Sequence, residues 1–242
     1  MPSKSRLIYN LYSSYWQFLD ILFPPRCGGC GQKGSHWCPD CQRNVNLIAL
    51  PVCESCGQKI NQPGRCTRCV HVPPAFTALR SWGVFEGPVR NAIINLKYHR
   101  DIGLGEALAV PLAQMLRELA WEVEIVLPVP LGVARLRQRG YNQAGAVAYP
   151  LALAAGLSYR PNALRRTRET TSQVGLSYED RLVNVSGAFR ADPGTVSQRN
   201  ALVVDDVATS SATINACAMA LLKAGAKQVY GLTVARAIYQ QP

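Results

Sequence analysis

Eight of the nine cysteines fall between residues 27 and 69, as four C-x-x-C pairs. A C-x-x-C turn directs both sulfurs to one centre, and two such turns complete a tetrahedral zinc site. The pairs are Cys27/Cys30, Cys38/Cys41, Cys53/Cys56 and Cys66/Cys69. Disulfide bonding is the alternative, but it requires an oxidising compartment. Because the N-terminal sequence lacks the apolar core of a secretory signal, we expect a cytoplasmic protein with two structural zinc ions.

The cysteine segment contains an internal repeat. The stretch CGGCGQK at 27–33 recurs as CESCGQK at 53–59, and another C-x-x-C pair follows each copy. The repeat favours two consecutive four-cysteine ribbons, although a crossed arrangement that joins the first pair to the third also satisfies the spacing. Gly31 and Gly57 follow the first knuckle of each copy, where a tight turn suits glycine. Zinc would stabilise this apolar-poor segment by on the order of 10 kcal/mol per site.

We expect three parts in the 242-residue chain: an N-terminal helix over 1–25, the double zinc ribbon over 26–72, and a larger domain over 76–242. The paired prolines of HVPPAF, 71–76, mark the second boundary because neither a helix nor a central strand accepts them. No run of eighteen apolar residues occurs, so no transmembrane segment is expected.

Apolar residues in the first part keep helical spacing, namely Leu7, Ile8, Leu11, Tyr15, Phe18, Leu19 and Leu22. The spacing predicts a helix with one apolar face. Few basic residues accompany that face, which favours a helix packed on its own protein over one that lies on a membrane surface.

The larger domain alternates predicted strands and helices. Strands are expected over 79–85, 124–130, 201–205 and 228–236, and helices over 88–98, 103–119, 142–156 and 213–224. Pro111 and Pro150 should kink or split two of these helices. The alternation indicates an α/β fold with a largely parallel sheet, in which ligands bind at the carboxyl ends of the strands.

The stretch ALVVDDVATSSAT, 201–213, joins a buried strand to two carboxylates and a loop of hydroxyl residues. We expect Asp205 and Asp206 at the strand end, outside the packed sheet. Ionised carboxylates accept hydrogen bonds from vicinal sugar hydroxyls, and a loop before a helix N-terminus suits a phosphate. A ribose phosphate satisfies both halves, with a divalent metal to offset the charge. The candidate site is Asp205, Asp206, Val207, Ala208, Thr209, Ser210, Ser211, Ala212 and Thr213.

The formal net charge of +11 favours an anionic partner. From Ile125 to Arg168 there is no acidic residue, and the span holds seven arginines, at 135, 137, 139, 160, 165, 166 and 168. A run of residues that carry only positive charge is commonly just a solvated face. The arginine-containing run flanks a predicted strand-end loop, however, and arginine binds phosphate bidentately. We therefore favour an anion site.

The cysteine pairs, the acidic stretch 201–213 and the arginine-rich span together resemble the sequences of the ComF family of competence and DNA-utilisation proteins, which are relatives of the type I phosphoribosyltransferases. VVDDVATSSAT resembles the family's phosphoribosyl pyrophosphate (PRPP) motif, which usually has glycine in place of Ser211. FPPRCGGCG with the later cysteine pairs resembles a double zinc ribbon, and NLKYHRD at 95–101 is also similar. PVPLGVARLRQRGYNQA at 128–144 resembles the pyrophosphate loop, and the segment at 165–189 resembles the flexible hood.

The resemblance implies a type I phosphoribosyltransferase-like, mostly parallel sheet with flanking helices, preceded by the double zinc ribbon. It implies that PRPP or another ribose phosphate binds with Mg²⁺, and that Asp205 and Asp206 are catalytic. It also implies a pyrophosphate loop with Leu131, Gly132, Arg135, Arg139 and Gly140. If the phosphate loop keeps the family's backbone, Ser211 has a positive φ.

The sequence is compatible with two functions. One is a phosphoribosyltransferase whose acceptor nothing in the sequence identifies. The other is a non-catalytic accessory module that keeps the ribose-phosphate pocket and binds single-stranded DNA through its ribbons and arginines. In both cases the resemblance implies a role in DNA uptake or utilisation, with other DNA-uptake proteins as partners.

Overall fold

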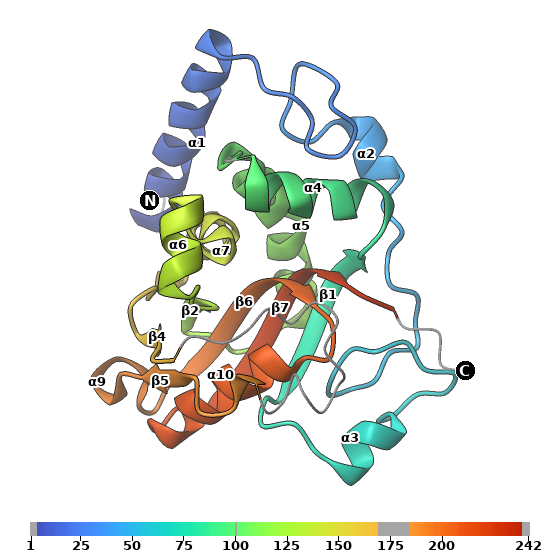
Figure 1. The fold of residues 1–242 in the computed structure, drawn as a ribbon, viewed down its shortest axis with the longest axis vertical. Coiled ribbons are helices and arrows are strands. Elements are labelled where there is room, and N and C mark those ends of the chain that lie inside the picture. The colour runs from blue at the N-terminus through green and yellow to red at the C-terminus, as the bar shows by residue number, and fades with distance from the viewer. Residues whose placement is uncertain (1–3, 100, 169–183, 239–242) are drawn as a thin grey trace.

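The computed structural model describes residues 4–99, 101–168 and 184–238. A parallel five-stranded sheet in the order β1-β7-β6-β2-β3 forms its centre (Figure 1). The strands are β1 (Ala78–Val84), β2 (Ile125–Pro128), β3 (Ser158–Tyr159), β6 (Asn200–Ala208) and β7 (Gln228–Arg236). The two longest strands, β6 and β7, lie side by side within the sheet and are almost continuously buried, as expected of strands covered on both faces.

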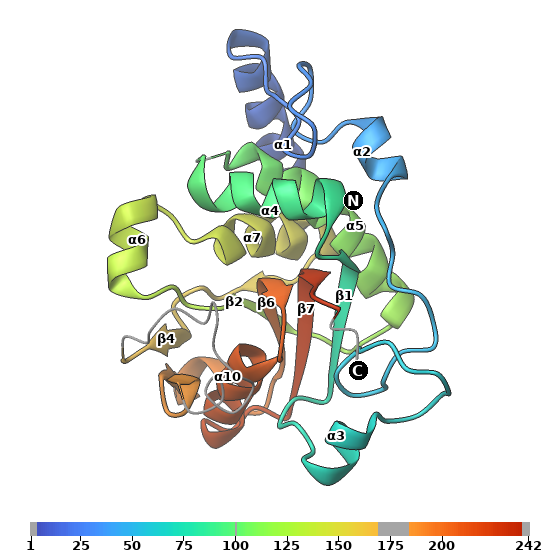
Figure 2. The same cartoon turned by 45° about the vertical axis from the view of Figure 1, so that its right-hand side comes forward.

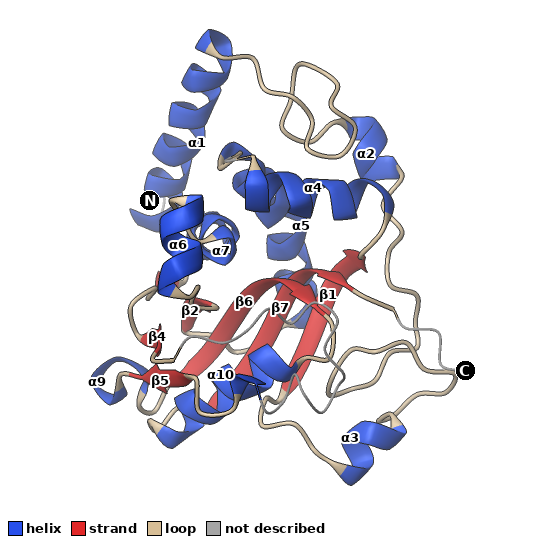
Figure 3. Ribbon diagram, in the orientation of Figure 1, coloured by secondary structure: helices blue, strands red, loops and turns tan. Residues whose placement is uncertain are grey.

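Helices cover both faces of this sheet (Figure 2). One face carries α4 (Gly87–Tyr98), α5 (Gly103–Leu119) and α7 (Gln143–Ala155), whose apolar side chains form one core cluster. The other face carries α10 (Ala212–Lys223) and the antiparallel pair β4 (Leu164–Arg166) and β5 (Phe189–Ala191), which contribute to a second cluster. The short helices α6 (Val133–Arg139) and α9 (Pro193–Val196) lie in the connections (Figure 3). The predicted fold class, a mostly parallel sheet with flanking helices, is confirmed.

The expected splitting of two helices at proline does not occur. Pro111 lies inside α5 and Pro150 inside α7, and neither helix is split there. Each proline removes one backbone donor from its helix. Both helices bury one face against the sheet, with Leu108, Leu112 and Leu151 fully enclosed, and this burial offsets the lost hydrogen bond.

The N-terminal helix α1 (Lys4–Leu22) contacts the rest of the protein through residues other than those predicted. Its contacts are aromatic and polar: Tyr12 packs edge-on against Tyr149 of α7, Trp16 packs edge-on against His36, and Asp20 Oδ1 lies 3.0 Å from His36 Nε2. Most of the predicted apolar face is exposed instead, including Leu7, Ile8, Leu11, Tyr15, Phe18 and Leu22. The helix therefore packs on its own protein as favoured, but its aliphatic stripe faces outward. Within residues 4–99, 101–168 and 184–238, no helix is long and apolar enough to cross a membrane.

Candidate metal centres and anion site

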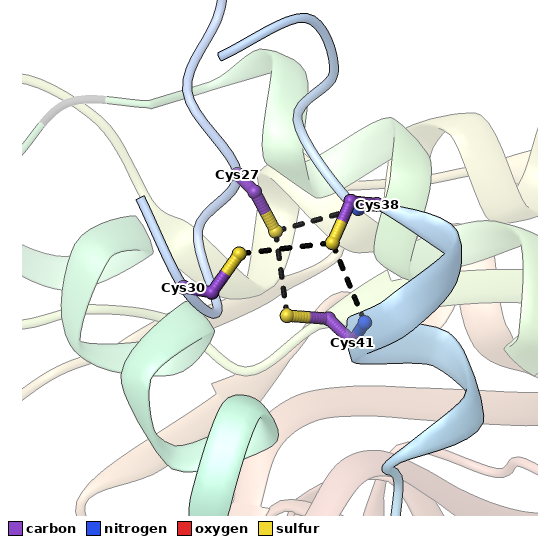
Figure 4. A group of neighbouring side chains, drawn as sticks. All are labelled: Cys27, Cys30, Cys38 and Cys41. Carbon is purple, nitrogen blue, oxygen red and sulfur yellow. Dashed lines mark hydrogen bonds between the residues drawn. The ribbon is translucent and has the colours of Figure 1, made fainter. Parts of the chain in front are cut away.

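The eight ribbon cysteines gather into two groups, Cys27/Cys30/Cys38/Cys41 and Cys53/Cys56/Cys66/Cys69. Within each group the sulfur atoms all lie within 4.8 Å of one another. In the first group the Sγ atoms of Cys27 and Cys41 are 3.5 Å apart, and those of Cys30 and Cys38 are 3.7 Å apart (Figure 4). A tetrahedral ion with zinc–sulfur bonds of about 2.3 Å requires sulfurs about 3.8 Å apart. Both groups fit zinc, and the pairing is sequential, so the crossed arrangement is excluded.

The two knuckles repeat one another in their backbone hydrogen bonds. The amide of Gly31 donates to the Cys27 carbonyl at 2.8 Å, and the amide of Gly57 donates to the Cys53 carbonyl at 2.9 Å. Both glycines have positive φ, 81° and 70°, as their place after the knuckle predicted. Burial alone would raise the pKa of the Cys53 thiol, but amide donors from Cys66, Cys56 and Ser55 and the Cys56 thiol lower it to about 6. Such amides stabilise a thiolate, the form that binds zinc.

The ribbons attach to the sheet domain at separate places. The first ribbon (27–41) rests on α4, where the side chains of Asn91 and Asn95 donate to the carbonyls of Gly29 and Gly28. The second ribbon (53–69) rests on the edge strand β1, where the amide of Leu79 donates to the Ser55 carbonyl at 2.7 Å. Two short helices belong to the ribbon segments, α2 (Pro39–Arg43) and α3 (Thr67–His71).

The acidic pair lies inside β6, which corrects the expectation that it would lie outside the packed sheet. Asp205 is 9% exposed and Asp206 is 4% exposed. Pairing of β6 with β7 continues past them to Ala208, and Asp205 stands opposite Thr233 in the register. Because successive strand residues point to opposite faces, the two carboxylates have different surroundings. The partners of the two carboxylates therefore differ.

Asp206 is paired with a cation, and the pKa values of the two carboxyl groups shift in opposite directions. The ammonium group of Lys97, on α4, pairs with Asp206 Oδ2, and Gln143 Nε2 donates to Asp206 Oδ1 at 3.5 Å. Burial would raise the pKa of Asp206, but the charge of Lys97 and the side-chain hydrogen bonds with Asp205, Lys97 and Gln143 together lower it. Burial and the neighbouring negative charge of Asp206 raise the pKa of Asp205 well above its usual value. Neither Lys97 nor Gln143 was predicted as a site residue, although both lie in segments that carry the family resemblance.

The hydroxyl-rich loop begins within β6 and ends in α10. Val207 and Ala208 are the last strand residues, Thr209–Ser211 form the bend, and Ala212 and Thr213 open the helix. Ser211 has φ 65° and ψ 8°, the left-handed conformation expected where the family has glycine. Its hydroxyl is buried and has no hydrogen-bond partner among the described residues. The backbone strain and the unpartnered hydroxyl both fall at the helix N-terminus, where anions bind.

The predicted pyrophosphate loop is mostly helical. Leu131 and Gly132 precede α6, Arg135 lies within it, Arg139 ends it, and Gly140 closes it with φ 82°. The guanidinium of Arg139 donates to Gln143 Oε1 at 2.8 Å and lies 5.2 Å from the centre of the Tyr98 ring. Since Gln143 also donates to Asp206, Arg139 is linked through one side chain to the acidic pair.

Arg137 of the acid-free span also lies in α6, and Arg160, Arg165, Arg166 and Arg168 lie on and around β4. Arg165 stands directly opposite Arg190 of β5 in the antiparallel register, and both are exposed. With Arg160 they line an open cleft of about 710 Å³. The central part of the predicted hood, residues 169–183, lies outside the described residues.

Comparisons with known proteins agree with this arrangement. A double zinc ribbon domain family matches residues 18–70. A DNA utilization protein YhgH of Salmonella typhi is 32% identical over 203 residues, which cover 81% of this chain and 88% of that protein. Competence protein F of Haemophilus influenzae is 27% identical over 208 residues, which cover 83% and 90%.

The structural neighbours include phosphoribosyltransferases. The glutamine PRPP amidotransferase of B. subtilis is similar with a TM-score of 0.40 and 21% identity over 58% of this chain, which spans only 30% of that protein. The chain matches these relatives over most of their length, and its two four-cysteine groups match the double zinc ribbon family. The chain belongs to the ComF family of competence and DNA-utilisation proteins.

Proposed function

We propose that this protein binds PRPP or another ribose phosphate with Mg²⁺ at Asp205, Asp206 and the loop 207–213, and that it acts in DNA uptake or utilisation. One observation carries the proposal: a buried acidic pair runs directly into a loop whose serine is held at positive φ before a helix N-terminus. Carboxylates suit the sugar hydroxyls and the helix N-terminus suits the phosphate, so one ligand satisfies both. The names of the relatives support the role in DNA utilisation.

The charges of the unliganded site are consistent with a ligand that brings hydroxyl donors and a cation. Asp206 already faces Lys97, and burial and the charge of Asp206 raise the pKa of Asp205. Mg²⁺ prefers carboxylate and phosphate oxygens, and its charge would favour ionisation of Asp205. Ribose hydroxyls would then donate to carboxylate oxygens.

Arg139 and the segment 131–140 are suited to the pyrophosphate. If the protein is a transferase, the bond from the anomeric carbon to pyrophosphate breaks and a bond from that carbon to the acceptor forms. The chain would contribute by positioning the ribose and by stabilising the charge that develops on the leaving pyrophosphate. Arg139 is suited to the second task because a guanidinium binds phosphate oxygens bidentately.

Calorimetric titration with PRPP and Mg²⁺ tests the proposal. The wild type should bind, and the double variant Asp205→Asn/Asp206→Asn should lose at least about tenfold in affinity, because hydrogen bonds to charged groups contribute about 1.5–3 kcal/mol each. Asp40→Asn is the matched control, since Asp40 is an exposed carboxylate on α2 that pairs with Arg43. Equal affinity of the wild type and the double variant would refute the ribose assignment.

The second candidate, a single-stranded DNA-binding module, is favoured by the cleft at β4 and β5. Like charges directly opposite across a strand pair are destabilising, so the Arg165–Arg190 pair favours an anion. Asp192, which accepts a hydrogen bond from Thr195, is the acidic member of the lining. Binding of a single-stranded oligonucleotide should weaken steeply with salt, and Arg165→Gln should reduce the slope by about 0.7. A slope unchanged by the variant would remove the cleft from this role.

A further inference from the structure

The second zinc ribbon lies against the phosphate loop. A small, partly open cavity of about 50 Å³ lies between Cys56, Arg68 and Cys69 of the ribbon and Ser210, Ser211 and Ala212 of the loop. A single water needs roughly 10–15 Å³ on this kind of measure, so the cavity admits a group of a few heavy atoms, such as a phosphoryl group. The ribbon is thus a wall of the space in front of the α10 N-terminus.

The ribbon is held in this position by buried contacts. Arg236, at the end of β7, is fully buried and donates to the Cys56 carbonyl and, at 3.5 Å, to Gln58 Oε1. The chain that leaves the ribbon is also fixed, because the amide of Ala75 donates to Asn215 Oδ1 of α10 at 2.7 Å. The cysteines of this ribbon share a core cluster with Phe76 and Leu79 of the sheet domain. These contacts therefore fix the position of the second ribbon relative to the loop Thr209–Ala212.

Two features inside the cavity indicate an anionic ligand. Ser211 is 7% exposed, and its hydroxyl has no partner among the described residues although it lines the cavity. A buried hydroxyl without a hydrogen bond is unfavourable, so a ligand acceptor would stabilise it. Arg68 brings a cation to the same space, and a helix N-terminus adds partial positive charge.

We propose that Arg68 of the second zinc ribbon binds the same phosphate as the loop Thr209–Ala212, so that the ribbon forms part of the ligand site. The ligand class is a phosphate monoester, and its assignment to the 5′-phosphate of a ribose phosphate rests on the proposed function above. In this arrangement the guanidinium of Arg68 and the Ser211 hydroxyl donate to phosphate oxygens from opposite sides of the cavity. The first ribbon has no residue in this cavity, so the two ribbons have different roles.

Titration of the full chain with ribose 5-phosphate and with inorganic phosphate tests the inference. Arg68→Gln should weaken binding of both by about tenfold or more, the usual range for losing a hydrogen bond to a charged group. Arg68→Lys should recover part of the loss, since it keeps the charge but not the fork of donors. Arg65→Gln is the matched control, because Arg65 is an exposed arginine of the same ribbon that does not line the cavity. Zinc content should be equal in all four proteins.

The outcomes separate this inference from the proposed function. If ribose 5-phosphate binds the wild type and Arg68→Gln equally, the inference is wrong and the proposed function stands. If neither PRPP nor ribose 5-phosphate binds but inorganic phosphate binds and its binding is weakened by Arg68→Gln, the proposed function is wrong and the inference stands. If the wild type binds neither phosphate ligand, or if Arg65→Gln weakens binding as much as Arg68→Gln, the inference is overturned.

Discussion

Lys97 of α4 pairs with Asp206 of β6, so the negative charge of one member of the acidic pair is already balanced in the unliganded protein. The side chain of Asp206 is only 6% exposed and that of Lys97 is 23% exposed. Removing one partner of a buried ion pair leaves the other without compensation. The pair therefore links the helix that supports the first ribbon to the strand that carries the candidate site.

Asp206→Asn should lower the free energy of unfolding by up to about 3–5 kcal/mol, because it leaves the Lys97 ammonium largely buried without its partner. The loss should be smaller than this range if Lys97 turns toward solvent. Urea unfolding measures it. The double variant Lys97→Met/Asp206→Asn should recover part of the stability, and a double variant less stable than Asp206→Asn alone would contradict the pairing.

Asp205→Asn should stabilise the unliganded protein, and the gain should grow with pH. The raised pKa of Asp205 means that the folded state holds a proton that the unfolded state releases above about pH 3.9. Wild-type stability is therefore lost as the pH rises from that value through the folded-state pKa, whereas asparagine does not titrate. Urea unfolding at a series of pH values should show a widening gap, and a gap independent of pH would count against a protonated Asp205.

The two ribbons should differ in their effect on the sheet domain. The wild type should contain two zinc ions per chain by elemental analysis, and Cys69→Ser and Cys41→Ser should each lose one. Cys69 belongs to the large cluster under the sheet, whereas Cys41 packs in a separate cluster with Trp37. Cys69→Ser should therefore lower the thermal unfolding midpoint of the sheet more than Cys41→Ser. Equal midpoints, or fewer than two zinc ions in the wild type, would contradict this arrangement.

Ser211→Gly should raise the stability of the unliganded protein by about 1 kcal/mol, because the left-handed conformation costs a non-glycine residue about 1–2 kcal/mol. Affinity for ribose 5-phosphate should fall by about tenfold or more, since the lost hydroxyl contact is to a charged phosphate and such hydrogen bonds contribute about 1.5–3 kcal/mol. Ser211→Ala is the matched control, because it removes the hydroxyl and keeps the strain. A stability gain for Ser211→Ala equal to that for Ser211→Gly would show that strain is not the cause.

Local patterns predicted what local chemistry controls. The spacing of the cysteines and the repeat CGGCGQK/CESCGQK predicted both zinc groups, and the alternation of strands and helices predicted the parallel sheet. The positive φ of Ser211 followed from a glycine position in the family's loop. In each case the residues that decide the outcome are close together in the chain.

The features that the sequence did not predict depend on contacts between segments that are distant in the chain. The burial of Asp205 and Asp206 depends on β7, α4 and α7, and the lowered pKa of Asp206 depends on Lys97, which no pattern near residue 206 contains. The proximity of Arg68 to Ser211 depends on how the second ribbon docks on β1. The exposed stripe of α1 also follows from docking, because Tyr12 and Trp16 make the contacts that the aliphatic residues were expected to make.

Recognition of ribose by the acidic pair is tested most directly by comparing ribose 5-phosphate with 2-deoxyribose 5-phosphate, in the presence of Mg²⁺, by calorimetry. The two ligands share the phosphate that the loop would bind and differ in one hydroxyl that the carboxylates would accept. The wild type should bind ribose 5-phosphate about tenfold more tightly, and this preference should disappear in Asp205→Asn/Asp206→Asn. Equal affinity of the wild type for the two sugars would contradict ribose recognition at Asp205 and Asp206.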